Sequence, residues 1–355
     1  MKMLLSGKSK DMTQFFSDKL RVVSFISIIL VMYIHSMDSE GVYQGASVSV
    51  IVRNCISGVL GPCAVPMFFA ISGYLFFFSL RNGISDVFLK IKKRVNTLLI
   101  PFVIAAILYP LQPILKAVIL NITPDKDYIQ LIKDLPVIET LKCMFYDSGT
   151  NHPWAYHLWF LRDLIIIVIA SPLLFYLRRW TGYLSVIVIV ALYAFFPDLS
   201  FLYGMIWFVA GSLFLDSIRE MPLLKVIAMF SVFLALAICR FTFDIEPRYY
   251  RIIEIAFGIT SLWCMYDYVV NPNFRLKDSK VLNFVCQFTF FLYLFHVPTL
   301  HAIYKGLLGV FGKNEFGYTL TYLLSPVVFI PLGLLAGFIL KKYTPIIYKI
   351  IVGNR

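Results

Sequence analysis

Two ionisable side chains lie in one apolar stretch of the sequence, where they could do chemistry inside a membrane. The stretch from Leu20 to Ser36 is long and apolar enough to cross a bilayer, with Arg21 near its start and His35 near its end. Fourteen residues of α-helix rise about 21 Å and turn about 1400°, so the two side chains lie on nearly one face at different depths. Since a charge facing lipid costs roughly 2.5–3.5 kcal/mol on insertion scales, both are expected to face the protein interior or a wet cavity.

Each of these two side chains has a chemical role and a simpler alternative. A neutral imidazole at His35 could take a proton from an attacking hydroxyl near neutral pH, whereas the alternative is interfacial packing. The planar guanidinium of Arg21 could bind a phosphate or carboxylate, whereas the alternative is an anchor that fixes membrane orientation. The pair therefore predicts a site with an anion-binding end and a proton-accepting end.

Further polar residues interrupt other apolar stretches. Ser72 and Gly73 lie in the run from Val65 to Tyr74, where they allow close helix approach and bonding between helices. Trp159, Arg162 and Asp163 follow His157, and we expect the arginine and aspartate to pair with one another or with neighbouring helices.

Three more features complete the set of candidate residues. His296 is a second deep histidine, and Pro298 follows it in the run from Phe290. Arg251 and Glu254 have the spacing of an intramembrane ion pair. The basic run of Lys90, Lys92, Lys93 and Arg94 fits either membrane orientation or the phosphates of a nucleotide-bearing cofactor.

Composition places these residues in a polytopic helical membrane protein. The chain has 355 residues, is 59% hydrophobic and only 15% charged, and has a mean hydropathy of +0.79. Apolar runs recur from end to end, which predicts an all-α protein with about ten transmembrane helices. The expected spans are 20–37, 56–80, 98–120, 158–177, 182–197, 199–215, 223–239, 250–270, 281–304 and 318–340, of which the short fifth and sixth could be a re-entrant pair.

The distribution of basic residues predicts the orientation. About twice as many Lys and Arg fall on the side of the two chain ends as on the other side, so both termini are expected in the cytoplasm. The predicted organisation is a cytoplasmic tail over 1–19, a membrane domain over 20–340 and a second cytoplasmic tail over 341–355. The longest connection, 121–156, then lies outside and is either functional or a solvated cap.

The remaining composition excludes several classes of function. The formal charge of +12 comes from Lys and Arg between apolar spans, so it indicates orientation and attraction to anionic lipid and no binding of nucleic acid. The six cysteines form no CxxC pair and no histidine lies at metal-ligand spacing, so no metal is expected. Nothing in the sequence indicates an oligomeric state.

Together, the motifs resemble those of the acyltransferase 3 family of integral-membrane O-acyltransferases, which modify surface glycans. The resemblance rests on Tyr33-Ile-His35-Ser36, the run from Pro66 to Tyr74, Lys92-Lys93-Arg94 with Pro101, the run from Leu158 to Asp163, and Tyr293 to Pro298. These motifs cover about residues 20 to 300 in the family's order. One departure is that the family has ten residues between its first-helix Arg and His, whereas thirteen separate Arg21 from His35; Ser24 occupies the family's Arg position.

The resemblance implies a reaction and a set of residue roles. An acyl group, most often acetyl, would pass from acyl-coenzyme A on the cytoplasmic side to a sugar hydroxyl of a lipid-linked or exported glycan. Arg21, Lys92, Lys93 and Arg94 would hold the donor, and His35 would act as general base or carry the acyl group. Supporting or substrate-binding roles would fall to Ser72, Gly73, Trp159, Arg162, Asp163 and His296. The implied location is a bacterial inner membrane, with the bilayer as surroundings.

Two other classes of function remain open at this point. A transporter or flippase for a glycan or glycolipid would also bury polar residues in a membrane, and inverted repeats with paired broken helices would favour it, although the sequence shows neither clearly. A sensor or scaffold that keeps the fold without catalysis is the other class. Detectable acyl transfer would separate the enzyme from both.

Overall fold

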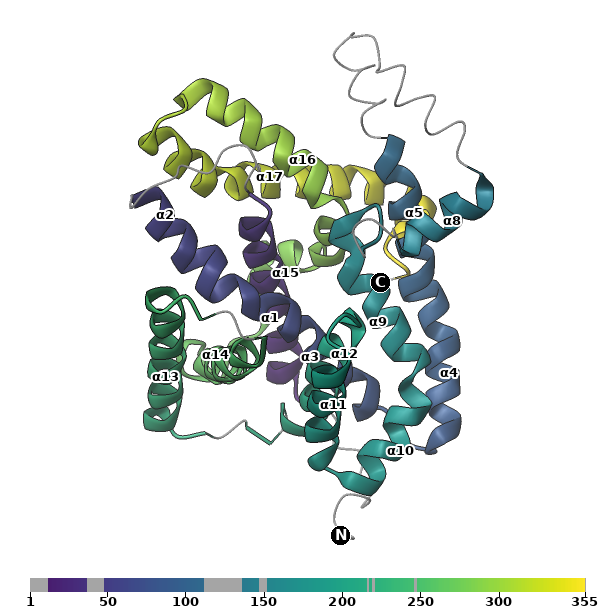
Figure 1. Cartoon of the computed structure of the whole chain (residues 1–355). Helices are drawn as coiled ribbons and strands as arrows, with labels where there is room; N and C mark the ends of the chain where they lie inside the picture. The colour runs from purple at the N-terminus through teal and green to yellow at the C-terminus, as the bar shows by residue number, and fades with distance from the viewer. Residues whose placement is uncertain are drawn as a thin grey trace.

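The structure, a computed structural model, describes residues 12–36, 48–111, 136–146, 152–215, 217–218, 221–245 and 248–354. Throughout these residues the regular structure is helical, without a strand, so the all-α prediction is confirmed (Figure 1). Most of the predicted outer connection, residues 121–156, lies outside the described residues.

The first part of the described chain contains these helices: α1 (Gln14–Ile34), α2 (Val48–Arg53), the π-helix η2 (Asn54–Leu60), η3 (Gly61–Cys63), α3 (Ala64–Phe78), α4 (Ile84–Arg94), the π-helix η4 (Val95–Leu99), α5 (Ile100–Leu108), η5 (Tyr109–Leu111), α8 (Val137–Phe145) and η6 (Tyr156–Leu158). The second part contains α9 (Trp159–Ile169), α10 (Ser171–Thr181), α11 (Leu184–Phe195), α12 (Ser200–Phe214), α13 (Leu223–Thr242), α14 (Arg248–Val269), η7 (Leu276–Asp278), α15 (Lys280–Cys286), α16 (Thr289–Phe311), α17 (Glu315–Tyr343) and α18 (Pro345–Ile351).

Several helices have the length and apolar composition of membrane spans. Among the described residues there are five, or seven if each of two bent helix pairs counts as one span. Helix α1 is 21 residues long but is not one of these, because its first half carries the charged residues Asp18, Lys19 and Arg21. The count of about ten spans and the cytoplasmic location of both termini stay predictions.

Two of the predicted spans are broken by sharp bends. Tyr156–Ile169 and Ser171–Thr181 meet at 66°, and Pro172 lies at the start of the second segment. Lys280–Cys286 and Thr289–Phe311 also meet at 66°. Helix ends at such a break direct their unpaired backbone groups toward whatever lies beside them.

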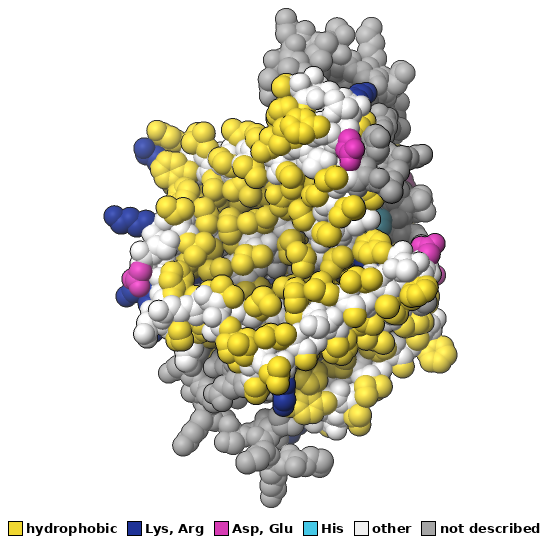
Figure 2. Space-filling view, turned by 90° about the vertical axis from the view of Figure 1, so that its left-hand side faces the viewer, with side chains coloured by type: hydrophobic (Ala, Val, Ile, Leu, Met, Phe, Trp, Pro, Cys, Tyr) yellow, Lys and Arg dark blue, Asp and Glu magenta, His cyan; other side chains and the backbone are white. Residues whose placement is uncertain are grey.

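The outer surface of the molecule is largely apolar, as expected where lipid replaces water. Figure 2 shows one such face covered by hydrophobic side chains, with the charged ones few and mostly near its margins. The long helices α13 and α17 expose large apolar side chains, including Leu224, Ile238, Val327 and Leu335. Buried apolar side chains are most frequent in α1, α3, α12 and α16.

The charged start of α1 is buried against the end of α14 and against η7. Lys19 is 1% exposed; its Nζ lies 2.7 Å from a carboxylate oxygen of Asp267 and 4.1 Å from the centre of the Trp263 ring. Asp18 accepts a hydrogen bond of 2.9 Å from the backbone N–H of Leu276. These contacts give the charges partners inside the protein and fix the end of α1 that carries Arg21.

Helices α3 and α12 touch backbone to backbone at two glycines. A Cβ atom added to Gly73 would lie 1.8 Å from the carbonyl oxygen of Phe208, and one added to Gly211 would lie 2.1 Å from that of Ala70. No side chain fits at either position without separating the helices. The predicted packing role of Gly73 follows from this contact.

Replacing Gly73 by alanine is expected to destabilise the protein by at least 1–3 kcal/mol, the usual cost of overpacking, because α3 must move away from α12. Thermal unfolding in detergent, followed by loss of the monodisperse fraction, measures this effect. Gly306→Ala is the matched control, since nothing lies within 4 Å of its added Cβ and alanine favours the helix. Equal melting temperatures for the two variants would contradict the close contact.

The last described helix and the residues after it pack on segments that are distant in the sequence. In α18, Tyr348 is 3% exposed and its ring packs on Phe288 and Phe291, with centroids 6.0 and 5.9 Å away. Gly353 follows with a positive φ of 71°, and a Cβ there would lie 2.7 Å from Cα of Thr97 in η4. Part of the predicted tail over 341–355 is thus a helix, and Gly353 after this helix lies against the segment directly after Arg94.

Candidate functional site

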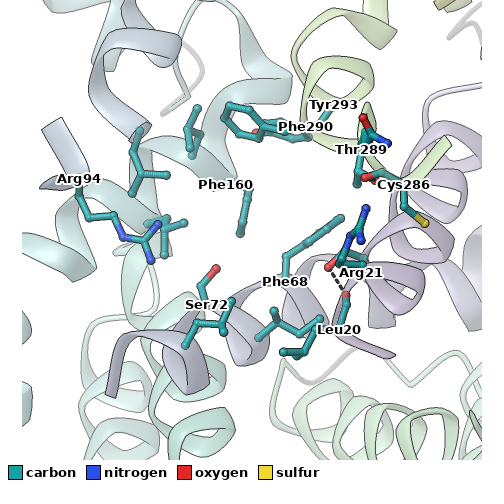
Figure 3. Close-up of a pocket in the computed structure, with 17 residues that line it drawn as sticks. Leu20, Arg21, Phe68, Ser72, Arg94, Phe160, Cys286, Thr289, Phe290 and Tyr293 are labelled. Atoms are coloured by element: carbon teal, nitrogen blue, oxygen red, sulfur yellow. Dashed lines mark hydrogen bonds between the residues drawn. The ribbon is translucent and has the colours of Figure 1, made fainter. Parts of the chain in front are cut away.

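A cavity of about 400 Å³ lies between α1, α3, α4, α9 and the break between α15 and α16. Figure 3 shows Arg94 and Arg21 on opposite sides of it, with Ser72 below and Phe290 and Tyr293 above. Most other lining side chains are apolar, among them Phe68, Ile71, Leu98, Leu161, Leu164 and Phe290. The cavity therefore combines two cations with an apolar interior, which suits a ligand with an anionic part and an extended uncharged part.

Arg21 reaches the cavity from α1. It donates a hydrogen bond of 3.1 Å to the side-chain oxygen of Asn283 in α15, which holds the guanidinium toward the cavity. Ser24, one turn further along α1, lines the same cavity. A shift of three residues changes direction on a helix by about 60°, so the arginine keeps its access to the cavity despite the thirteen-residue spacing to His35.

Arg94 reaches the cavity from the other side, at the end of α4. Lys92 and Lys93 are exposed and outside the cavity lining, so of these three predicted donor-binding residues only Arg94 lines the cavity. Lys90 has a structural role, because its ammonium donates to the carbonyl groups of Leu75 and Phe76 at the end of α3. Positive charge at a helix C-terminus complements the free carbonyl groups there.

Three histidines lie close to one another outside the cavity lining. The ring of His296 lies 5.2 Å from that of His35 and 5.5 Å from that of His157, measured between centroids. Tyr156 packs on His35 at 5.6 Å. The structure thus brings the two predicted histidines together and adds His157, which sequence reasoning did not assign to the site.

The orientation of His157 follows from a proline. Pro298 has no N–H, so the carbonyl of Leu294, four residues earlier in α16, loses its helical donor. The Nε2 atom of His157 lies 3.2 Å from that carbonyl oxygen. Since a carbonyl only accepts, we assign the proton of His157 to Nε2, and Nδ1 is then a buried acceptor without a partner.

The same argument fixes the tautomer of His296. Its Nδ1 lies 2.7 Å from the carbonyl oxygen of Tyr293, so Nδ1 carries the proton and donates. Nε2 is then a proton-free acceptor, and it is buried without a hydrogen-bond partner in a side chain that is 0% exposed. An unsatisfied buried group costs about 1–3 kcal/mol, and such groups are rare in native proteins.

Tyr293 and Phe160 separate the cavity from the histidines. Both line the cavity, and their rings meet edge to face at 5.7 Å. The Tyr293 hydroxyl donates a hydrogen bond of 3.1 Å to the carbonyl oxygen of His157. One aromatic layer, held by α16 and η6 together, thus lies between the arginine end and the histidine end.

Arg162 and Asp163 form a buried pair away from the cavity. Their nearest charged atoms are 2.8 Å apart, Asp163 is 0% exposed, and Arg162 also donates to Ser200 Oγ in α12 at 2.7 Å. The prediction that they pair is confirmed. Trp159, predicted as a supporting residue, is half-buried and packs on Phe69 with centroids 6.5 Å apart.

Removing one partner of this pair is expected to destabilise the protein strongly. Arg162→Leu should cost about 3–5 kcal/mol, because it leaves the buried Asp163 carboxylate without a countercharge. The double variant R162L/D163L should recover most of the loss, which thermal unfolding in detergent would measure. A double variant no more stable than the single one would mean that Arg162 acts mainly through other contacts.

The predicted pair of Arg251 and Glu254 is present, but Glu254 has a closer partner. Arg251 lies 3.4 Å away, whereas Arg240 of α13 lies 2.8 Å away and also donates to the carbonyl of Gly58 at 2.9 Å. Gly58 belongs to the π-helix η2, far from Arg240 in the sequence. This contact between distant segments has no signal in local spacing.

Within the described ranges, no group of three or more His, Cys, Asp or Glu is placed to hold a metal ion. Comparisons with curated proteins and with solved structures yield no match. Residues 18–341 match the family model described as an acyltransferase domain. This match covers nearly the whole chain, including α1 with Arg21 and His35, the cavity and the histidine cluster, and the chain therefore belongs to the acyltransferase 3 family of membrane proteins.

Proposed function

We propose that the protein transfers an acyl group, acetyl in the simplest case, from acyl-coenzyme A to a sugar hydroxyl of a lipid-linked or exported glycan. The observation that carries this proposal is the cavity between Arg21 and Arg94, one aromatic layer away from the histidine cluster. Acyl-coenzyme A has phosphates for the two guanidinium groups and an uncharged arm for the apolar interior. No metal is part of the proposal.

The arginine end of the cavity would bind and orient the donor. Guanidinium groups bind phosphate oxygens through paired, charge-assisted hydrogen bonds, and two of them facing each other can hold more than one phosphate group. Lys92 and Lys93, exposed on α4, would attract the donor from solution through their charge. The volume of about 400 Å³ suits part of the donor, with the remainder outside the cavity.

The histidine end would carry out acyl transfer. His35 would take the proton of the acceptor hydroxyl as general base, or would carry the acyl group itself. His35, which directly follows α1, lies fourteen positions after Arg21, which corresponds to about 21 Å along the helix. This separation is two thirds of the apolar thickness of a bilayer, so it supports a donor that binds at the cytoplasmic side and an acceptor that enters from the other side.

The test is an acyl-transfer assay in membranes that contain the protein. Radiolabelled acetyl-coenzyme A is added together with lipid-linked glycans of the host, and the label in the glycan fraction is measured. Label above that of membranes without the protein supports the proposal, and alkaline release of labelled acetate identifies the ester. No label with acetyl, propionyl or butyryl donors would contradict it.

One observation favours the transporter as a second candidate. Broken helices with their ends at a common site are typical of secondary transporters, and the protein has two bent helix pairs. Only the break between α15 and α16 lines the cavity, through Cys286, Gln287 and Thr289. Movement of labelled glycolipid across proteoliposomes without acyl donor, together with absence of acyl transfer, would identify the transporter.

A further inference from the structure

We propose that His296 is the proton acceptor of the transfer step and that His35 carries the acyl group. This inference rests on the proposed function and deepens it, since it divides two roles between two histidines. The observation that carries it is the fixed orientation of the His296 ring, which leaves Nε2 proton-free, buried and unpaired beside His35.

Several contacts hold His296 in this state. Its Nδ1–H donates to the Tyr293 carbonyl, and the Tyr293 hydroxyl is bound to the carbonyl of His157. His157 in turn donates through Nε2 to the carbonyl of Leu294, which Pro298 leaves without a backbone donor. These three hydrogen bonds fix the rings of His157 and His296, and Nε2 of His296 is left without a hydrogen-bond partner. A base must keep a free lone pair of this kind until the substrate arrives.

His35 has a different environment. It is half-buried at the end of α1, whereas His296 is fully buried, and the two rings are tilted by 55° with centroids 5.2 Å apart. A group on a ring nitrogen of His35 would therefore lie within reach of His296, and a hydroxyl that approaches this group could meet both rings. The partly exposed ring is better placed to exchange an acyl group with incoming molecules.

The two steps balance as follows. In loading, a ring nitrogen of His35 bonds to the thioester carbonyl carbon, the carbon–sulfur bond breaks, and coenzyme A leaves as thiolate with the electron pair. In transfer, the acceptor oxygen bonds to the same carbon, the carbon–nitrogen bond breaks, and the electron pair returns to His35. The hydroxyl proton passes to Nε2 of His296 and then to solvent, so that both rings are neutral again.

His296→Asn is the test variant, because the asparagine amide can still donate to the Tyr293 carbonyl while the base nitrogen is lost. With purified protein in detergent and acetyl-coenzyme A, release of free coenzyme A is followed in the first turnover, and transfer to glycan is followed afterwards. We expect a first-turnover release close to one per chain, as in the native protein, and a loss of transfer of at least 100-fold.

Hydroxylamine gives an independent readout in the same variant. It attacks acyl groups without a base, so H296N should form acetyl hydroxamate at a rate within about threefold of native, whereas His35→Ala should form none above the uncatalysed background. A structural role of His296 would reduce this reaction as well. If H296N fails to fold, His296→Gln replaces it with the same two readouts. The melting temperature of each variant shows whether it is folded and therefore which one is used.

Each of the other possible results overturns a specific part of the proposed mechanism. Transfer to glycan by H296N within threefold of native would remove His296 from the reaction and leave the proposed function intact. Loss of first-turnover release by a folded H296N would assign His296 to loading and overturn its role in transfer. If the native protein transfers no label with any donor, it is the proposed function that fails.

Discussion

Replacing His35 by alanine is expected to reduce acyl transfer by at least 100-fold at unchanged protein level. In the proposed reaction the imidazole takes part in bond making either as a base or as the acyl carrier, and loss of a positioned acid–base group alone costs about 10²–10⁴ in rate. Transfer of label from acetyl-coenzyme A into the glycan fraction, normalised to the amount of protein in the membrane, measures the effect.

The control for this variant is another residue of the same helix. Ile26 is 48% exposed on the outer face of α1, so Ile26→Ala changes the helix without changing the histidine cluster. It should keep full activity. Activity of H35A within threefold of that of I26A would remove His35 from the chemistry and would require another explanation for its contact with His296.

Replacing Arg21 by alanine is expected to raise KM for acetyl-coenzyme A by about 10–100-fold. A hydrogen bond to a charged group contributes about 1.5–3 kcal/mol, and the guanidinium would contribute at least one such bond to a donor phosphate. The effect on kcat should be smaller, since Arg21 lies fourteen positions before His35, about 21 Å away along the helix axis. Initial rates over a range of donor concentrations separate the two parameters.

The position of the arginine on α1 can be tested in the same assay. Ser24 lines the cavity together with Arg21, so the double variant R21A/S24R places a guanidinium in the cavity about one helical turn closer to His35. It should recover at least half of the loss in log KM. No recovery, with both proteins folded, would mean that the hydrogen bond from Arg21 to Asn283 defines the site more strictly than access to the cavity does.

Arg179 provides a charge-matched control for both variants. It is exposed at the end of α10 and is not part of the cavity lining, so Arg179→Ala removes one positive charge without changing the cavity. If R179A raised KM as much as R21A does, general attraction of the anionic donor would explain the effect. A specific effect of R21A supports the assignment of the cavity to the donor.

Much of the fold could be predicted because lipid imposes a simple rule on sequence. Backbone groups in lipid must be paired within the segment, so long apolar runs are helices, and their polar residues point inward. Arg21, Arg162, Asp163 and His296 follow this rule. The bend at residue 170 has a signal in Pro172, which the apolar run around it concealed, whereas the bend at residue 287 lies in a stretch without a proline.

The types of residue in the site could be predicted, but which of them lie in contact with one another could not. His35 and His296 stood out as deep histidines, but nothing in local spacing indicated that their rings lie 5.2 Å apart. His157 was missed as a member because it follows a long polar connection and resembles a residue at the start of a span. Its signal was Pro298, which predicts a free carbonyl in α16 that needs a donor from elsewhere.

The contacts of α18 and of Gly353 after it have a consequence for how the protein is made. Arg94 enters the membrane early in synthesis, but the contact of Gly353 with Thr97 and the burial of Tyr348 against Phe288 and Phe291 need residues that the ribosome adds far later. The wall of the cavity that carries Arg94 is therefore completed only after nearly all other described helices have been inserted. A nascent chain that stops before residue 345 would contain both arginines and all three histidines, yet it would lack the support that holds η4 in place.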